Sequence, residues 1–364
     1  MQHNRTFWKK MIAFGLVASM SLPMAGAFAQ TDEPTEEPTE VAPIELEAVD
    51  PLSVTGDIAI AGSSTVEPVT VAMAARFNDD GFTGNIAVAE TGTGAGFERF
   101  CGEGSTDISN ASRPIKDSEL ENCTAIGRSV LAFQIGIDAL TVAVSQDSPV
   151  SELTHSQLID IFTGAVTTWD QVNPEWPAET IQLFTPGTDS GTFDFFGEAV
   201  LGTKGAYADG AARTDALLAP NPTTSENDNT LVEGIQGSPY AIGYFGFAYY
   251  VENADTLKAV SIADDVSWDD DGNVTAIPAD QWEAEEIAYI TPDAETAESG
   301  EYMLSRPLFI YSASEILAEK PQVAAFISYY LSNAPEVVTE VGYFPVSTET
   351  LNASKQAFLD ATAQ

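Results

Sequence analysis

Basic residues are scarce in this chain. Only 14 Lys and Arg stand against 55 Asp and Glu, and the formal net charge is −41 at pH 7. Nucleic acids and anionic membranes attract basic surfaces, so a chain this acidic predicts neither of them as a partner. The excess of acid favours solubility and would also suit a high-salt habitat.

Long apolar runs are missing as well. The first 29 residues carry Arg5, Lys9 and Lys10, then an apolar core from 11 to 22, then the small-residue pattern that ends at Ala29. This order is typical of a secretory signal peptide cleaved after Ala29, and the core is too short for a membrane-spanning helix. No cysteine lies near the cleavage site, so we expect no lipid anchor. The sequence predicts a periplasmic or extracellular protein.

The segment that follows, 30–54, is acidic and rich in Pro, Thr and Glu, most clearly in 31–40. A composition of this kind cannot bury enough apolar surface to offset the entropy of ordering the chain. We expect a disordered linker.

Cysteine and histidine are almost absent. Cys101 and Cys123 are the only cysteines. An even pair in an exported chain predicts one disulfide, which contributes about 3 kcal/mol by the chain-entropy estimate. Two free thiols are the alternative. Beyond the signal segment His155 is the only histidine; it lies in a polar, helix-like stretch and is predicted at the surface. We expect neither a metal centre nor a cofactor.

Four segments share one local pattern, in which glycine and small hydroxylated residues open a helix. They are Ala61–Val66, Thr91–Gly96, Asp107–Ser112 and Thr185–Thr192. A helix start leaves several N–H groups unpaired and carries the positive end of the helix dipole, which suits an oxyanion. One such start usually means simple capping, and Ser112 is an expected N-cap with Pro114 in the first turn. Four starts in one chain favour an anion-binding site.

Strand-like and helix-like runs alternate in the rest of the chain, without a repeat of solenoid period. Expected strands are Ala132–Gly136, Leu140–Val144, Ile181–Phe184, Ala241–Tyr244 and Leu308–Tyr311. Expected helices are Ser151–Phe162, Asn227–Ile235, Ser314–Ala318 and Pro321–Leu331. This alternation predicts an α/β protein with helices on both faces of its sheets, and a chain of this size usually divides its core in two.

The four helix starts also resemble the signature segments of the phosphate-binding proteins that serve bacterial phosphate ABC transporters. The order of the segments matches, and the resemblance runs from about Gly56 to about Val346. It implies a two-domain periplasmic-binding-protein fold of type II, with two crossing strands near 133–138 and 302–310 and the ligand in the interdomain cleft. Domain I would comprise 55–137 and 306–364, and domain II 138–305.

The same resemblance implies which residues hold phosphate. They offer hydroxyl or backbone N–H donors at the helix starts: Ser64, Thr65, Val66 through its N–H, Thr93, Ser112, Ser190, Gly191 and Thr192. Hydroxyls donate or accept, which suits an anion that keeps one or two protons at neutral pH. The first five would come from domain I and the last three from domain II, so closure would complete the shell.

Two positions depart from the best-known members of that family. An aspartate that accepts the ligand's proton there aligns with Ser112, and an arginine four residues before the serine aligns with Pro186. Arg113 is the predicted replacement for the cation, with an ordinary surface cation as the alternative. Asp189 is the predicted proton acceptor, with a helix-capping carboxylate as the alternative.

These patterns together predict an exported, monomeric solute-binding protein that captures inorganic phosphate and delivers it to an ABC permease without catalytic turnover. A receptor for another oxyanion or a phosphate sensor is the first alternative. A secreted phosphohydrolase that uses Ser190 as nucleophile is less favoured, because neither a plausible base nor a His-rich metal cluster is present in the sequence.

Overall fold

The computed structural model describes residues 41–363. The predicted signal peptide, its cleavage site and linker residues 30–40 lie outside the described residues. Residues from Pro43 onward form one compact unit. No helix among the described residues is long and apolar enough to cross a membrane.

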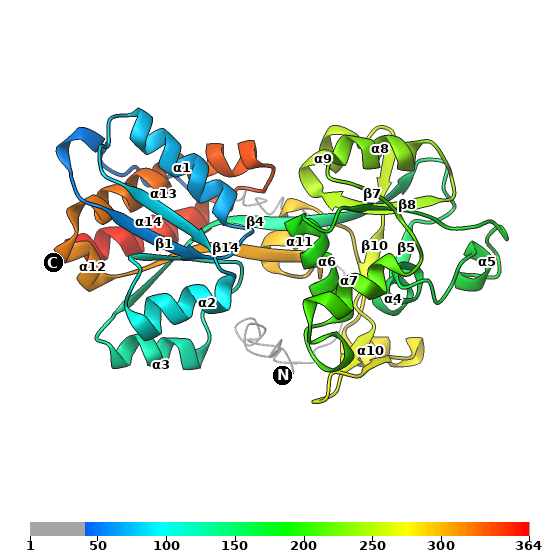
Figure 1. Cartoon of the computed structure of the whole chain (residues 1–364). Coiled ribbons are helices and arrows are strands. Elements are labelled where there is room, and N and C mark those ends of the chain that lie inside the picture. Colours follow the sequence, from blue (N-terminus) through cyan, green and yellow to red (C-terminus); the bar gives the residue numbers. More distant parts are fainter. Residues whose placement is uncertain (1–40, 364) are drawn as a thin grey trace, which may run out of the picture. The chain divides into compact units, whose positions relative to one another are not determined.

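A nine-stranded mixed sheet organises this unit (Figure 1). Its strands in spatial order are β2 (Ile86–Glu90), β1 (Ile58–Gly62), β3 (Ile108–Ala111), β14 (Ser305–Ala313), β4 (Val130–Ser145), β8 (Ala241–Gly246), β6 (Gln182–Pro186) and β7 (Thr223–Ser225), and β9 (Leu257–Ala259) also pairs with β4. β1 runs parallel to β2 and β3, and β6 runs parallel to β7 and β8. The sheet therefore contains two parallel groups, each of which ends its strands at one edge.

β4 and β14 join the two groups. β4 is 16 residues long, so the two strands predicted at 132–136 and 140–144 are one strand. β14 runs antiparallel beside it with Arg306 opposite Asp138. Figure 1 shows this pair passing from one group of elements to the other. The two predicted crossing strands are thus confirmed.

Helices cover both faces of the sheet. Those packed with the first parallel group are α1 (Glu67–Asp79), α2 (Thr93–Phe97), η3 (Glu98–Glu103), α3 (Asp117–Ala125), α12 (Ser314–Glu319), α13 (Pro321–Val341) and α14 (Thr348–Thr362). Those packed with the second group are α4 (His155–Phe162), α5 (Trp169–Val172), α6 (Gly191–Leu201), α7 (Gly210–Leu218), α8 (Asp228–Gln236) and α9 (Phe247–Glu252). α11 (Ala294–Ser299) packs against the β4–β14 pair, and α10 (Trp282–Glu285) lies on the side of the second group in Figure 1. Buried apolar runs in the strands follow from this two-sided cover.

The apolar core falls mainly into two clusters. Phe77 of α1 and Phe326 of α13 belong to the first, and Phe196 of α6 and Tyr244 of β8 belong to the second. Along β4 the first cluster ends and the second begins between residues 139 and 140. The exact domain limits, 55–137 with 306–364 and 138–305, stay a prediction.

Smaller elements complete the fold. They are the strands β5 (Glu152–Thr154), β10 (Ser261–Ala263), β11 (Val266–Trp268), β12 (Val274–Ala276) and β13 (Tyr289–Ile290), and the 3-10 turns η2 (Pro51–Ser53), η4 (Gly205–Tyr207) and η5 (Ala279–Gln281). The helix expected from Ser151 begins only at His155, because Glu152–Thr154 pairs in parallel with β10 and Thr154 caps the helix.

The range predicted for the disordered linker, 30–54, includes residues that pack against the folded unit. Leu46, Val49 and Val54 pack against the first core cluster. Ile44 donates its N–H to Asn352, and Lys355 donates to the carbonyl of Ile44. Apolar residues at these positions gain enough burial to order 44–54, whereas the Pro- and Glu-rich part before residue 41 contains none.

The predicted disulfide forms between Cys101 of η3 and Cys123 of α3, 22 residues apart in sequence. It joins the two elements that flank β3.

We expect the Cys101→Ala/Cys123→Ala variant to lose about 3 kcal/mol of unfolding free energy, because the unfolded chain regains the freedom of the closed loop. Urea unfolding measures this loss. Reduction of the wild type should reproduce it and leave the double variant unchanged; an unaltered midpoint in fully reduced wild type would contradict the prediction.

Candidate functional site

The first helix start lies directly after β1. Gly62 ends the strand with φ of 145°, and the chain then turns so that Glu67 donates its N–H to the carbonyl of Ser63. Thr65 and Val66 are buried in this turn, whereas Ser64 is exposed. Because α1 begins here, N–H groups of the turn have no partner within the helix. The turn can therefore present donors to an anion.

The second and third starts meet at Thr93 and Ser112. Their hydroxyl oxygens lie 3.2 Å apart, and the N–H of Ser112 donates to Oγ1 of Thr93. β2 and β3 flank β1 in parallel, so their carboxyl ends bring these side chains to one edge. The prediction that Ser112 is the N-cap of α3 is wrong, because that helix begins only at Asp117 and its N-cap is Lys116.

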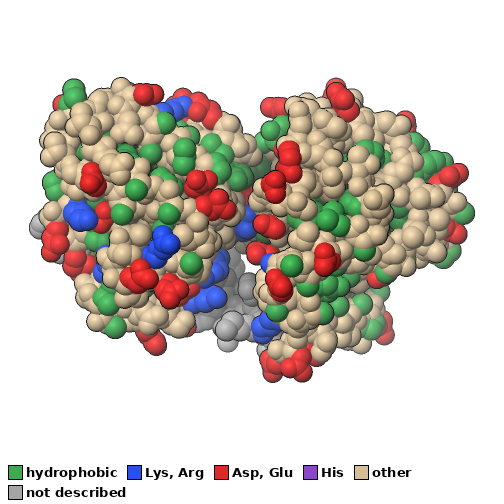
Figure 2. All heavy atoms as spheres, viewed as in Figure 1, with side chains coloured by type: hydrophobic (Ala, Val, Ile, Leu, Met, Phe, Trp, Pro, Cys, Tyr) green, Lys and Arg blue, Asp and Glu red, His purple; other side chains and the backbone are tan. Residues whose placement is uncertain are grey.

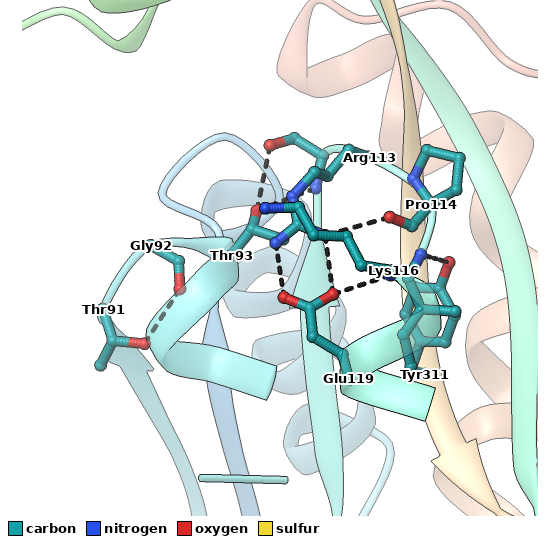
Figure 3. Close-up of polar contacts among 10 residues, drawn as sticks. Thr91, Gly92, Thr93, Arg113, Pro114, Lys116, Glu119 and Tyr311 are labelled. Atoms are coloured by element: carbon teal, nitrogen blue, oxygen red, sulfur yellow. Dashed lines mark hydrogen bonds and ion pairs between the residues drawn. The ribbon is translucent and has the colours of Figure 1, made fainter. Parts of the chain in front are cut away.

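Arg113 is held by a carboxylate of its own segment. Its two terminal nitrogens donate to Glu119 at 2.8 and 2.7 Å, as Figure 3 shows. Burial raises the pKa of Glu119, but hydrogen bonds from Arg113 and from the N–H of Lys116 outweigh it and lower the pKa. The fork predicted to bind an anion is thus bidentate on Glu119, and its role toward an anion stays a prediction.

The fourth start opens α6. Ser190 is the N-cap, and its hydroxyl accepts the N–H of Thr192 at 3.2 Å. Gly191 is exposed, and a Cβ there would meet nothing within 4 Å. Asp189 is exposed and its carboxylate forms no hydrogen bond or ion pair with the described residues. Since Ser190 takes the capping position, Asp189 is not the cap, and its role as proton acceptor stays a prediction.

Arg306 is the site residue that the sequence reasoning missed. Its Nε donates to Asp138 at 2.9 Å, and its Nη2 donates to the hydroxyl of Thr65 at 2.6 Å. The guanidinium lies over the ring of Phe195 in α6, 3.9 Å from the centroid. It therefore connects a crossing strand with both the first and the fourth helix start. A lone arginine within the predicted crossing strand 302–310 of an acidic chain was the available signal.

The charges around Arg306 are unevenly solvated. Burial raises the pKa of Asp138, and the adjacent Arg306 opposes that rise. Burial also raises the pKa of Asp194 of α6, while Arg213 and Arg306 lower it and Glu90 raises it. Glu90 ends β2 and Asp194 lies in the first turn of α6, so the effect of Glu90 on the pKa of Asp194 reflects the closeness of these two elements.

Asp228 begins α8 at the carboxyl end of β7, and burial together with Glu226 raises its pKa to about 6. A raised carboxyl pKa favours the folded state below the unfolded value near 4, and this contribution is lost as the pH rises through 6. We expect the melting temperature of Asp228→Asn to lie above that of wild type at pH 8 and to equal it at pH 4. Thermal melts across this range measure the effect. Asp255→Asn, at an exposed position, is the control; the same pH profile in both variants would contradict the assignment.

His155 is buried, which corrects the prediction that it lies at the surface. Only 2% of the residue is exposed. Nδ1 lies 2.8 Å from Asp264 and Nε2 lies 2.9 Å from the carbonyl of Val200. Both ring nitrogens are engaged by acceptors other than Ser190. No group of three or more potential metal ligands occurs among residues 41–363.

A groove separates the two parallel groups on the face of the molecule drawn in Figure 2. Lys and Arg side chains gather along part of its rim, among Asp and Glu. The contact of Arg306 with Thr65 and with Phe195 crosses between the same two groups.

Comparison with known proteins agrees with this arrangement. A model of the PBP superfamily domain matches residues 35–334. A crystal structure described as a possible phosphate binding protein from Planctomyces limnophilus is 36% identical, covers 85% of this chain and 99% of that chain, and has a TM-score of 0.71. Protein SphX of Synechococcus elongatus is 37% identical over 302 residues, 82% of this chain and 80% of that protein. Phosphate-binding protein PstS of Staphylococcus epidermidis is 35% identical over 283 residues, 78% of this chain and 76% of that protein.

The chain belongs to the PBP superfamily, and the predicted α/β periplasmic-binding-protein fold is confirmed. Within that superfamily it belongs to the phosphate-binding proteins of the PstS type, as the resemblance of its four helix starts implied.

Proposed function

We propose that this protein is an exported receptor that binds one inorganic phosphate at its helix starts and delivers it to an ABC permease. The observation that carries the proposal is the contact of Arg306 with Thr65 and Phe195, since it ties the start of α1 to the second turn of α6. Hydroxyls and N–H groups at such starts provide neutral donors at contact distance, where screening by salt has little effect. The acidic surface of the chain is therefore compatible with an anionic ligand.

The shell that we propose keeps the residues implied by the sequence. Donors would come from Ser64, Thr65, Val66, Thr93, Ser112, Ser190, Gly191 and Thr192, with Arg113 as the predicted cation and Asp189 as the predicted proton acceptor. Thr93 and Ser112 are already in contact. The proposed protein is a transport receptor and not an enzyme, in keeping with the family to which it belongs.

The proposal extends to processing and assembly. We infer cleavage after Ala29 without a lipid anchor, a monomeric state and no nucleic-acid partner, from the sequence pattern of the first 29 residues and the charge of −41. The two domains would be 55–137 with 306–364 and 138–305, in keeping with the division of the apolar core near residue 139.

Calorimetric titration tests the function. Mature protein is stripped of ligand by partial unfolding and refolding, then titrated with phosphate, sulfate and arsenate. We expect one-to-one binding of phosphate and no heat from sulfate, because an acceptor in the site would favour an anion that carries a proton. Absence of phosphate binding would refute the proposal. Hydrolysis of a chromogenic phosphate ester would instead support a phosphohydrolase.

Thr65→Val should weaken phosphate binding by roughly 30-fold, since it removes a hydroxyl at a charged ligand without changing the shape of the side chain. Thr124→Val is the matched control, because the hydroxyl of Thr124 donates only to the carbonyl of Leu120 on the exposed side of α3. The same titration measures both variants. Equal affinities of the two variants would remove Thr65 from the shell.

A further inference from the structure

We propose that Arg306 supplies the guanidinium that binds the anion, in the position for which the sequence favours Arg113. This inference rests on the proposed function. A protein that encloses phosphate gains most from a planar fork of donors, because such a fork matches two oxygens of the anion at once. The two candidate arginines differ in what already occupies that fork.

The guanidinium of Arg113 is already occupied by protein acceptors. Its two terminal nitrogens donate to the two carboxylate oxygens of Glu119, at 2.8 and 2.7 Å, and Nη1 also donates to the carbonyl of Pro114. To bind an anion this guanidinium would have to leave a bidentate carboxylate that is half-buried beside it. Figure 3 shows the guanidinium of Arg113 directed at the carboxylate of Glu119.

Arg306 has donors to spare. Nε and Nη2 each lie 2.9 Å from Oδ2 of Asp138, and Nη2 also donates to the hydroxyl of Thr65, while Nη1 forms no hydrogen bond with the described residues. A guanidinium carries five N–H donors, so the two on Nη1 remain for a ligand. The side chain is 13% exposed, which places it deep enough to act in a medium of low polarity.

The surroundings hold this fork in one orientation. Asp138 lies directly opposite Arg306 in the β4–β14 pair and is buried, with its side chain 5% exposed. The Phe195 ring covers one face of the guanidinium plane at 3.9 Å. Asp138 on β4 and Phe195 on α6 therefore act as positioning residues, and the remaining donors point away from both.

The location agrees with the proposed shell. The hydroxyl that Arg306 touches belongs to Thr65, one of the predicted phosphate ligands, and Phe195 follows the predicted ligand Thr192 by one turn of the same helix. A phosphate that accepts hydrogen bonds from the start of α1 and from the start of α6 comes within reach of the free Nη1. No comparable contact joins Arg113 to α6 among the described residues.

Titration of four variants with phosphate tests the assignment: Arg306→Gln, Arg306→Lys, Arg113→Gln and Arg76→Gln. We expect Arg306→Gln to weaken binding by about 100-fold and Arg306→Lys by about tenfold, because lysine keeps the charge and loses the fork. Arg76→Gln is the surface control, since Arg76 pairs only with Glu336 and Glu340 of α13. A wild-type affinity in Arg306→Gln would overturn the inference, and a large loss in Arg113→Gln alone would restore the sequence-based assignment.

Two further measurements keep the test decisive. Arg306→Gln leaves a buried carboxylate unpaired and can fail to fold, so the Asp138→Asn/Arg306→Gln variant, which removes both charges, is titrated beside it; we expect the same 100-fold loss. In wild type, phosphate should slow modification of Arg306 by an arginine-selective dicarbonyl reagent, read by mass spectrometry, and leave that of Arg76 unchanged. Equal rates with and without phosphate would contradict the inference. A wild type that binds no phosphate would refute the proposed function itself.

Discussion

The Gly62→Ala variant is expected to lose about 3 kcal/mol of unfolding free energy or more. Gly62 ends β1 with φ of 145°, a conformation that L side chains rarely adopt. A Cβ at this position would lie 2.0 Å from the carbonyl oxygen of Asn110 in the paired strand β3. Because the obstacle is the backbone of the paired strand at Asn110, neither strand can move away without breaking the pairing.

Urea unfolding measures this loss, and the Gly94→Ala variant is the control. Gly94 lies inside α2, where a Cβ would meet nothing within 4 Å. Alanine favours a helix over glycine, so that variant should be as stable as wild type or slightly more stable. Equal unfolding midpoints for the two variants would show that β1 and β3 approach less closely than described.

The His155→Phe variant is expected to lose about 3 kcal/mol. One ring nitrogen of His155 faces the carboxylate of Asp264 and the other faces the carbonyl of Val200. The ring therefore lies between two oxygen acceptors, and a nitrogen that carries hydrogen donates to the one it faces. Phenylalanine fills the same space but has no ring nitrogen, so the contacts with the Val200 carbonyl and with Asp264 are both lost.

A graded comparison separates this effect from packing. His155→Asn keeps one donor that reaches toward Asp264 and should lose less than His155→Phe, although it leaves more empty space. Chemical denaturation at pH 7 gives both values. A phenylalanine variant as stable as wild type would mean that the two hydrogen bonds contribute nothing net.

Local pattern predicted much of the fold. Short apolar runs ending in glycine and hydroxylated residues located β1, β2, β6 and the starts of α1, α2 and α6, because strand ends and helix caps are set by neighbouring residues. The crossing strands were found through the family resemblance. The pairing of Cys101 with Cys123 followed from the cysteine count alone.

Partners distant in sequence could not be predicted in this way. Arg306 meets Thr65 across 241 positions and His155 meets Asp264 across 109. No periodicity carries such a pairing, since it depends on how the strands lie side by side. The ion pair of Arg113 with Glu119 spans only six residues; the sequence predicts Ser112 as the N-cap of this helix, whereas the N-cap is Lys116.

A crystal structure of the stripped protein soaked with phosphate would locate the anion itself. We expect one phosphate between the starts of α1, α2 and α6, within hydrogen-bond distance of the hydroxyl of Thr65, the N–H groups of Gly191 and Thr192, and Nη1 of Arg306. Density for phosphate at another place, or none at saturating concentration, would contradict it and would mean that these helix starts serve only the fold.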